Sequence, residues 1–228
     1  MTDHLPYNPL DRKNLGKSVA EAMLGRKARP LSGLKSFKGA GIYALYYSGR
    51  FAPYSRLAAL NDPADPQVPI YVGKAVPKGG RKGDLPLAAP TTSQALYRRL
   101  IEHAESVKES SNLNIEDFIC RYLVVDDIWI PLAESLLIAK FSPVWNLLVD
   151  GFGNHDPGKG RYEGMRPRWD VLHPGRSWAA RCRDRPETAE QIASEVRSRL
   201  DQEPSLVQSR FLAEERRGRY VAEKDSGA

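Results

Sequence analysis

The sequence predicts an α+β domain, because three strand-like segments alternate with two helical segments in the order β-β-α-β-α. Aromatic and β-branched side chains mark the strands at residues 39–48, 70–74 and 118–125. Apolar side chains at helical spacing mark the helices at residues 91–107 and 132–141. With 228 residues and 41% hydrophobic content, the chain can bury one substantial core, so we expect a single elaborated domain.

Residues 39–48 (GAGIYALYYS) form the clearest strand, in which alternate side chains would face opposite sides of a sheet. Residues 70–74 supply the next strand. The insertion between them, residues 49–69, contains prolines and a helix-like piece near residues 55–60. The connection is therefore an expanded hairpin rather than a tight turn.

Each predicted helix carries a local start signal. Residues 91–94 (TTSQ) match a capping box, and Pro131 stands where the first turn of a helix tolerates proline. Residues 75–90, before the first helix, are rich in proline and glycine and contain Lys78, Arg81 and Lys82. That composition predicts a basic loop.

Extensions flank the core at residues 39–150. Residues 1–38 are expected to form a basic arm with a possible helix over residues 18–25. Residues 151–228 begin glycine-rich and basic, and they end in two polar helical stretches near residues 188–200 and 206–219.

The charge pattern suits a polyanionic partner. The net charge is +6 with a pI of about 9.3, and the excess of Lys and Arg falls on residues 1–38, 74–99 and 159–185. The two cysteines form no Cys-x-x-Cys pair, which argues against a disulfide framework or a cysteine-rich zinc site. Without a signal peptide or a long apolar run, the chain is expected to be a cytoplasmic protein with no membrane span.

Glu134 is the most informative single residue. If residues 132–141 are helical, Leu137, Ile138 and Phe141 share its face, so a carboxylate lies along a stripe that should be buried. A buried charge needs a compensating cation. A lone glutamate can hold Mg²⁺ when phosphate and water complete the shell, whereas the alternatives are an ion pair with an arginine or a place at the edge of the stripe.

Arg99 and His103 stand four residues apart, which places them on one helical face with room for a phosphate between them. The alternative is a solvated basic face. Tyr43 and Tyr71, taken alone, are equally consistent with half-buried strand tyrosines.

Taken together, these residues favour a shared functional site over separate structural roles. The tripeptides Gly41-Ile42-Tyr43 and Tyr71-Val72-Gly73, followed by Arg99, His103, Glu134 and Asn146, resemble the active-site set of the GIY-YIG nuclease superfamily. The resemblance implies a small three-stranded antiparallel sheet flanked by helices. The strings GAGIYALYYSG, IYVGKAVP, WN, DGFGNH and WDVLHPGRSWA further resemble the type II restriction endonucleases of that superfamily. Two departures are the valine at position 72 and the unusually long insertion before Tyr71.

The resemblance also implies a role for each residue. Tyr43 would be the general base, with its pKa lowered by a metal-bound environment and by a hydrogen bond with His103. Tyr71 would orient water or phosphate, and Arg99 would clamp the scissile phosphate. Glu134 would bind one Mg²⁺, Asn146 would keep neighbouring groups in register, and Lys74 would contact a phosphate.

Further DNA contacts are expected from two basic segments. The loop before the first helix offers Lys78, Arg81 and Lys82. The glycine-rich segment after Asp150 offers basic side chains interleaved with aromatic ones, which suits contacts to phosphates and base edges. Its candidates are His155, Lys159, Arg161, Arg166, Arg168 and Arg176. The alternative is a solvated basic loop.

The sequence therefore predicts a Mg²⁺-dependent, sequence-specific endonuclease that cuts both strands of double-stranded DNA at a short palindrome as a homodimer. The resemblance suggests a GC-only site of the CCGCGG kind. Two alternatives remain. One is another GIY-YIG nuclease, of the repair or homing type, and the other is a non-catalytic DNA-binding protein that has kept the fold.

Overall fold

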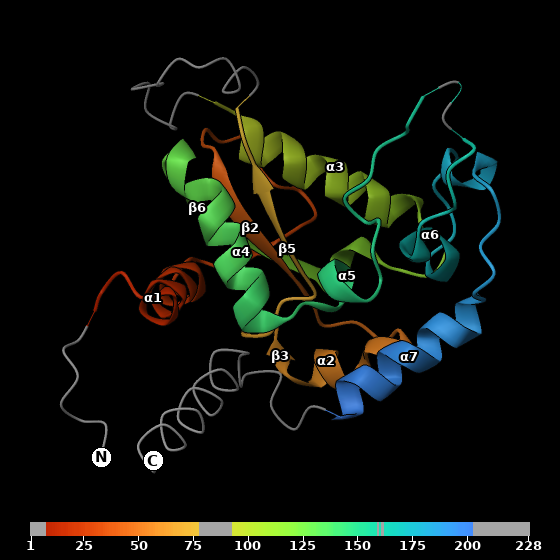
Figure 1. The fold of residues 1–228 in the computed structure, drawn as a ribbon, viewed down its shortest axis with the longest axis horizontal. Helices are drawn as coiled ribbons and strands as arrows, with labels where there is room; N and C mark the ends of the chain where they lie inside the picture. Colours follow the sequence, from red (N-terminus) through yellow and green to blue (C-terminus); the bar gives the residue numbers. More distant parts are fainter. Residues whose placement is uncertain (1–7, 78–92, 159, 161, 203–228) are drawn as a thin grey trace, which may run out of the picture.

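The computed structural model describes residues 8–77, 93–158, 160 and 162–202 (Figure 1). Its strands are β1 (Arg29–Pro30), β2 (Gly41–Tyr47), β3 (Asn61–Asp62), β4 (Asp65–Pro66), β5 (Tyr71–Ala75) and β6 (Phe118–Val124). Its α-helices are α1 (Arg12–Leu24), α2 (Ser55–Ala59), α3 (Ala95–Glu109), α4 (Ile130–Phe141), α5 (Val144–Leu147), α6 (Arg168–Leu172) and α7 (Ala189–Gln202). The α+β class predicted from the sequence is confirmed.

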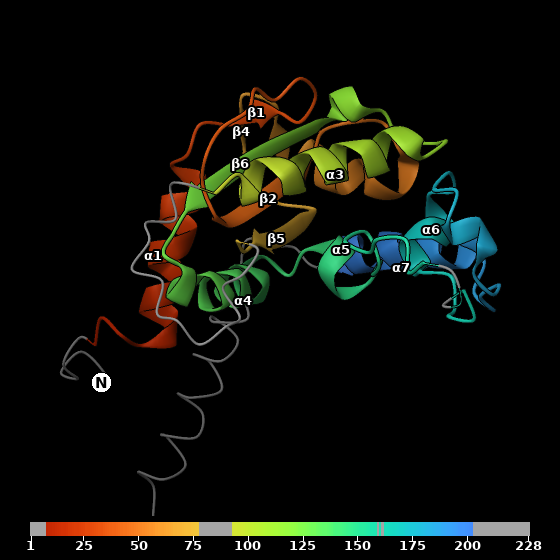
Figure 2. The same cartoon turned by 90° about the horizontal axis from the view of Figure 1, so that it is seen from above.

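The main sheet is antiparallel, with the strand order β1-β6-β2-β5. The three predicted strands form its core, and the two-residue strand β1 adds an edge that the sequence did not reveal. Every residue of the central strand β2 is buried. Helix α3 covers one face of the sheet, and α4 with α1 covers the other (Figure 2). Both faces of β2 are therefore excluded from water.

The helices begin at positions that differ in part from the sequence expectation. Helix α1 starts at Arg12, before the expected residues 18–25, because Asp11 caps it by accepting from the Lys13 backbone N–H. This helix packs against α4 and β6, so the segment expected to be an arm contributes to the body of the domain. Helix α4 begins at Ile130 with proline in its first turn, as predicted.

The expected capping box at residues 91–94 does not describe the start of α3. The helix begins at Ala95, whose backbone N–H is accepted by Ser93 Oγ at 3.1 Å, and Gln94 makes no capping hydrogen bond with its side chain. A short Ser-based cap thus replaces the predicted box, and the helix begins later than the pattern suggested. Residues 91 and 92 lie outside the described chain.

The insertion at residues 49–69 is folded. It contains α2, which overlaps the predicted helix-like piece, and the small β3-β4 sheet. Buried Asn61 holds the insertion against the core, because its side-chain amide donates to the carbonyls of Tyr47 and Val68 and its Oδ1 accepts from the backbone of Gln67 and Val68. Helix α7 packs on this insertion beside α2, so the C-terminal extension rests on it (Figure 1).

Several predicted features lie outside the described residues. These are the basic loop with Lys78, Arg81 and Lys82, the residues Lys159 and Arg161, and the helical stretch at 206–219. Within the described chain, no helix combines the length and apolar character needed to cross a membrane.

Candidate active site

Tyr43 and His103 form a buried pair at the centre of the domain. Tyr43 comes from the middle of β2 and His103 from α3, and the tyrosine Oη lies 2.6 Å from the histidine Nε2. In the sheet register, Tyr43 pairs with Gly73 of β5. A Cβ at position 73 would lie 2.3 Å from the Tyr43 Oη, so only glycine admits the ring there. The two tripeptides of the sequence are thus two halves of one packing arrangement.

Burial keeps both members of this pair neutral. Desolvation raises the pKa of Tyr43 well above its usual value, and the positive charge of Arg99 opposes this rise only in part. Desolvation also lowers the pKa of His103 well below its usual value. The protein environment alone therefore shifts the pKa of Tyr43 in the direction opposite to the one expected beside a bound metal, because the phenol has almost no contact with water.

Arg99 lies one helical turn before His103. Its Nη2 donates to the Gly153 carbonyl at 2.7 Å, and its Nη1 contacts Glu102 and His155. The Tyr71 ring lies beside the pair, with its centroid 6.2 Å from that of Tyr43. Burial raises the pKa of the Tyr71 phenol, and the Arg99 charge acts against that rise. The predicted arginine, histidine and two tyrosines therefore meet in one place.

Glu134 lies at the edge of the buried stripe of α4 rather than within it. Its side chain is 17% exposed, and its Oε2 pairs with Lys74 Nζ of β5 at 2.6 Å. The partner is thus a lysine and not an arginine. The negative charge of Glu134 also adds to the rise in the pKa of the Tyr71 phenol, after the larger effect of burial.

The single carboxylate of Glu134 fits a hard divalent cation that takes its other ligands from water and from the phosphate of the substrate. The described residues contain no cluster of three or more His, Cys, Asp or Glu side chains able to hold a metal ion. One carboxylate, with water and substrate phosphate oxygens, is how Mg²⁺ is commonly bound in phosphoryl-transfer sites.

Asn146 acts on the backbone of the second tripeptide. Its Oδ1 accepts from the Val72 backbone N–H and its Nδ2 donates to the Val72 carbonyl, both at 2.8 Å. The Trp145 backbone N–H donates at 3.0 Å to the carbonyl of Ile70, the residue directly before this strand. Helix α5 therefore closes the outer edge of β5 and fixes Tyr71 in place. The hydrogen bonds of Asn146 are of the kind expected for a residue that keeps its neighbours in register, and its role in the reaction stays a prediction.

A cleft of about 440 Å³ opens beside these residues. It is lined by Lys74, Ala75, Val76, Ala95, Arg98, Arg99, Glu102 and His155. Arg98 was not singled out by sequence reasoning, although it belongs to the basic segment 74–99. Its side chain is exposed and has no ion-pair partner among the described residues, so it is available to a ligand.

The C-terminal segment supplies two residues that the sequence analysis missed. The Phe152 ring stacks on His103, with centroids 4.5 Å apart and planes 16° apart. A Cβ at Gly153 would lie 2.8 Å from Tyr71 Oη, so glycine permits the backbone to reach the site. The DGFGNH string was the available signal, but it carries no recognisable pattern of catalytic groups.

Three arginines predicted to contact DNA are engaged within the protein. Arg176 is 2% exposed and pairs with Asp170. Arg168 pairs with Glu195 of α7, and Arg166 pairs with Asp184 and donates to Ala179 O. The assignment of Arg176 to DNA is therefore wrong, because its guanidinium is enclosed. His155, which is 63% exposed beside Arg99, remains a candidate contact.

The comparison with protein-family models agrees with this geometry. The model described as the Eco29kI GIY-YIG domain matches residues 35–200. No curated protein matches the chain. The matched range contains the Tyr43–His103 pair, Arg99, Glu134 and Asn146, as well as the C-terminal segment that carries Phe152. The chain therefore belongs to the Eco29kI family of GIY-YIG type II restriction endonucleases and is a DNA endonuclease.

Proposed function

We propose that this endonuclease cuts both strands of double-stranded DNA at a short palindromic sequence, in a Mg²⁺-dependent reaction, as a homodimer. The observation that carries the proposal is the neutral, hydrogen-bonded Tyr43–His103 pair beside Arg99 and Glu134. These groups supply a route for the proton of water, a fixed positive charge and a metal-binding carboxylate.

The raised pKa of Tyr43 constrains how it can act as a base. A buried phenolate would be costly, so the phenol needs an acceptor for its own proton at the moment it takes one from water. His103 Nε2 is the acceptor within reach, because it lies 2.6 Å away on a neutral ring. Burial also disfavours the imidazolium that forms, so the transfer needs the negative charge of the bound phosphate close by. In this scheme the attacking water gives a proton to Tyr43 Oη while the phenolic proton moves to His103, so the tyrosine stays neutral.

The remaining groups act on the phosphate. Arg99, held by Gly153 O and Glu102, presents a fixed positive charge to the negative charge that develops on the phosphate oxygens. Glu134 would hold the Mg²⁺ ion, which when bound offsets phosphate charge and makes a bound water more acidic. Lys74, whose side chain is 43% exposed, can exchange its contact with Glu134 for one with a phosphate.

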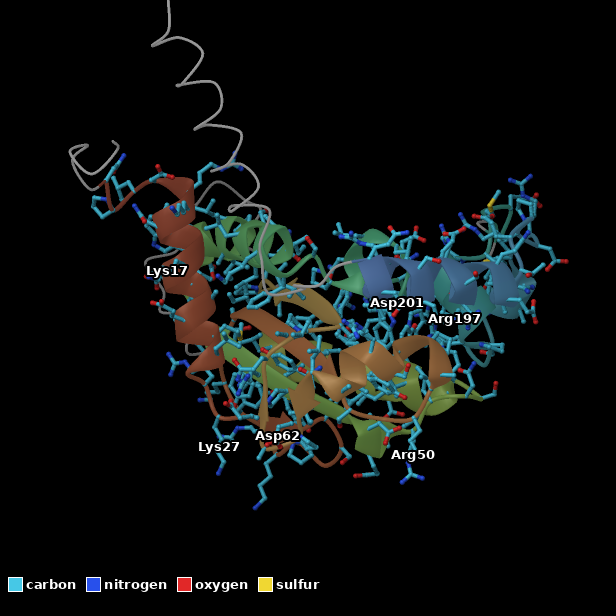
Figure 3. The ribbon with its side chains drawn as sticks, turned by 90° about the horizontal axis from the view of Figure 1, so that it is seen from below. Lys17, Lys27, Arg50, Asp62, Arg197 and Asp201 are labelled. Atoms are coloured by element: carbon cyan, nitrogen blue, oxygen red, sulfur yellow. The ribbon has the colours of Figure 1, made fainter. Side chains whose placement is uncertain are left out.

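The DNA path is supported by exposed cations without an ion-pair partner among the described residues. In the cleft this is Arg98, which lies near His155, an exposed side chain that contacts Glu102 and Arg99. A second group lies at residues 26–38, which we call the N-terminal basic patch. It contains Arg26, Lys27, Arg29, Lys35 and Lys38, all exposed and without an ion pair among the described residues. Figure 3 shows Lys27 at the periphery of the molecule.

The N-terminal basic patch surrounds a hollow suited to a nucleic acid. A pocket of about 520 Å³ is lined by Lys27, Arg29, Lys35 and Tyr122, with other residues of the segment. The Phe37 ring stacks on Tyr122 at 4.1 Å, and the Arg29 guanidinium lies over the same ring. Cations beside partly buried aromatic rings and apolar surface are a combination that can bind phosphates and bases.

The homodimer is proposed on symmetry. Each chain offers one Tyr43–His103 pair, which suffices for one strand, and a two-fold pair of chains matches a palindromic duplex. Sedimentation with and without DNA would test this. A monomer that cleaves both strands at unchanged rate as protein concentration falls would contradict the dimer.

The proposed function is tested by incubating purified protein with Mg²⁺ and plasmids of different sequence, including one that carries CCGCGG, and sequencing the ends of any fragments. We expect discrete fragments whose ends share one palindromic sequence, and no fragments when EDTA replaces Mg²⁺. A uniform smear, or cleavage that persists in EDTA, would contradict the proposal.

A further inference from the structure

The WDVLHPGRSWA segment, residues 169–179, contributes a buried cation that the catalytic scheme does not use. Arg176 is 2% exposed, and its guanidinium lies between the rings of Trp169 and Trp178, with its carbon 4.5 and 4.7 Å from their centroids. Its Nε and Nη2 donate to the two carboxylate oxygens of Asp170 at 2.6 and 2.5 Å. Asp170 is itself 2% exposed, so this is a fully enclosed ion pair.

The other donors of Arg176 bind one short stretch of backbone. Nη1 donates to the carbonyls of Phe152 and Asn154 at 3.0 and 3.1 Å, and Nη2 donates to that of Gly151 at 2.9 Å. With the two bonds to Asp170, all five N–H groups of the guanidinium have an acceptor. We call residues 151–154 the carbonyl loop.

The same carbonyl loop supports the active site. The Gly153 carbonyl accepts from Arg99 Nη2 at 2.7 Å, and the Phe152 ring stacks on His103. The carbonyls on either side of Gly153 along the loop are those that Arg176 holds. A shift of this backbone would therefore displace an acceptor of Arg99 and the ring that packs on His103.

We propose that the Asp170–Arg176 pair is a positioning device for catalysis, which fixes the carbonyl loop so that Gly153 orients Arg99 and Phe152 fixes the imidazole of His103. The inference rests on the proposed catalytic roles of Arg99 and His103. Arginine is required because its planar fork reaches three carbonyls and a carboxylate at once, whereas a lysine ammonium has three donors on one atom. Small errors in the placement of reacting groups have large effects on rate.

A matched control exists on β6. Arg121 is also 2% exposed, pairs with Asp65, and donates to the carbonyls of Arg26 and Pro66. Its guanidinium lies over the Tyr46 ring and has no hydrogen bond with a residue of the proposed catalytic scheme. Arg121→Lys therefore removes an equally buried arginine fork without touching the carbonyl loop.

The experiment compares Arg176→Lys with Arg121→Lys, using the full chain and a supercoiled plasmid that the wild-type protein cuts with Mg²⁺. At saturating enzyme, we expect Arg176→Lys to lower the single-turnover cleavage rate by roughly 10- to 100-fold, with DNA affinity in EDTA within about twofold of wild type. Arg121→Lys should leave the rate within about threefold, after both variants are shown to be folded. Equal losses in the two variants would overturn the proposal.

A double variant tests whether Arg176 acts through Arg99. Arg99→Ala combined with Arg176→Lys should be about as slow as Arg99→Ala alone, because the second change has no guanidinium left to misplace. If the two losses multiplied fully, Arg176 would not act through Arg99, and this step of the proposal would be overturned. If Arg176→Lys does not fold, Asp170→Asn replaces it, since it keeps the shape of the pair and removes its charge.

A spectroscopic measurement separates this inference from the nuclease proposal. Phe152 stacks on His103, so its ring current shifts the His103 ring protons, and labelled histidine makes them visible among the four histidines of the chain. Arg176→Lys should move this resonance and Arg121→Lys should not. An unmoved resonance in Arg176→Lys overturns the positioning role, whereas a wild-type protein that cuts no DNA overturns the proposed function alone.

Discussion

Two basic regions of this molecule use their positive charges in opposite ways. In residues 162–185 five of the six arginines are engaged by carboxylates, and Arg183 has no ion pair among the described residues. The pairs are Arg166–Asp184, Arg168–Glu195, Arg176–Asp170, Arg181–Asp156 and Arg185–Glu187. In the N-terminal basic patch, residues 26–38, no cation has an ion-pair partner in the described part of the chain. One region uses charge to hold the fold together, and the other leaves it available to a ligand.

The difference follows from which acidic groups lie nearby. Residues 26–38 contain no Asp or Glu, whereas the later segment contains Glu163, Asp170 and Asp184 and also meets Glu195 of α7. A count of positive charges therefore does not locate a DNA surface. The position of carboxylates around the cations decides whether a phosphate is needed to neutralise them.

The largest expected effect concerns the Lys74–Glu134 ion pair. This pair must open for Glu134 to bind a metal, whereas the ion pairs of residues 162–185 stay closed. Glu134→Gln should lower the cleavage rate by roughly 1,000-fold or more, because the carboxylate that holds the metal is lost. DNA affinity in EDTA should stay the same or rise, since a negative charge near phosphate is removed. Quench-flow cleavage and fluorescence anisotropy measure the two effects. Turnover near the wild-type rate would show that Glu134 does not bind the metal.

The next largest effect is the loss of stability at low pH, which we attribute to the two buried histidines, His103 and His173. Burial lowers the pKa of His173 to about 3, and it also lowers that of His103. Unfolded histidine has a pKa of about 6.5, so below that pH the unfolded chain binds more protons and the folded state loses stability. Thermal melts should show a lower Tm at pH 5.5 than at pH 8.

A variant isolates the contribution of His173 to this pH dependence. Its Nδ1 faces Asn112 Oδ1 and its Nε2 faces Tyr54 Oη, so the ring is held as one neutral tautomer. His173→Gln should reduce the difference in Tm between the two pH values. The exposed His155 serves as the control, and His155→Gln should leave that difference unchanged. An unaltered difference in His173→Gln would contradict the buried neutral histidine.

A smaller effect tests the structural use of charge in residues 162–185. Arg168→Ala should destabilise the protein by about 1 to 2 kcal/mol, because it removes a partly buried ion pair between α6 and α7 and the packing of the side chain. Chemical denaturation measures this. The salt dependence of DNA binding should not change, and a flatter salt dependence would place Arg168 at the DNA after all.

The smallest effects are expected in the N-terminal basic patch. Arg29→Ala and Lys35→Ala should each weaken DNA binding only several-fold and flatten the plot of log affinity against log salt by about one unit, with unchanged Tm. Lys17→Ala on α1 is the matched control, because Lys17 already pairs with Glu21. Salt slopes equal to wild type in both patch variants would remove residues 26–38 from the DNA path.

The sequence predicted those features that depend on local pattern. The three core strands follow from side-chain periodicity, and the site residues follow from two short motifs in a fixed order. The starts of α1 and α3 were predicted at the wrong residues, because Asp11 caps α1 ahead of the expected segment and Ser93 replaces the expected capping box of α3. The folded insertion also could not be foreseen, since Asn61 closes it through contacts set by the tertiary structure.

Contacts between distant residues account for what sequence reasoning missed in the site. The carbonyl loop and Arg176 are a case of this kind, because the acceptors are backbone groups with no sequence signature. The neutral state of the Tyr43–His103 pair was missed for a related reason. Its pKa shifts come from burial by several elements at once, which no motif encodes.

The most direct test of the catalytic account is single-turnover cleavage by Tyr43→Phe under saturating enzyme and Mg²⁺. The ring still fits against Gly73, so only the hydroxyl that faces His103 is removed. We predict a loss of at least about 100-fold in rate, the usual scale for a positioned general base, with DNA affinity unchanged. A rate within a few-fold of wild type would contradict the Tyr43–His103 proton route and leave His103 as the better candidate for the base.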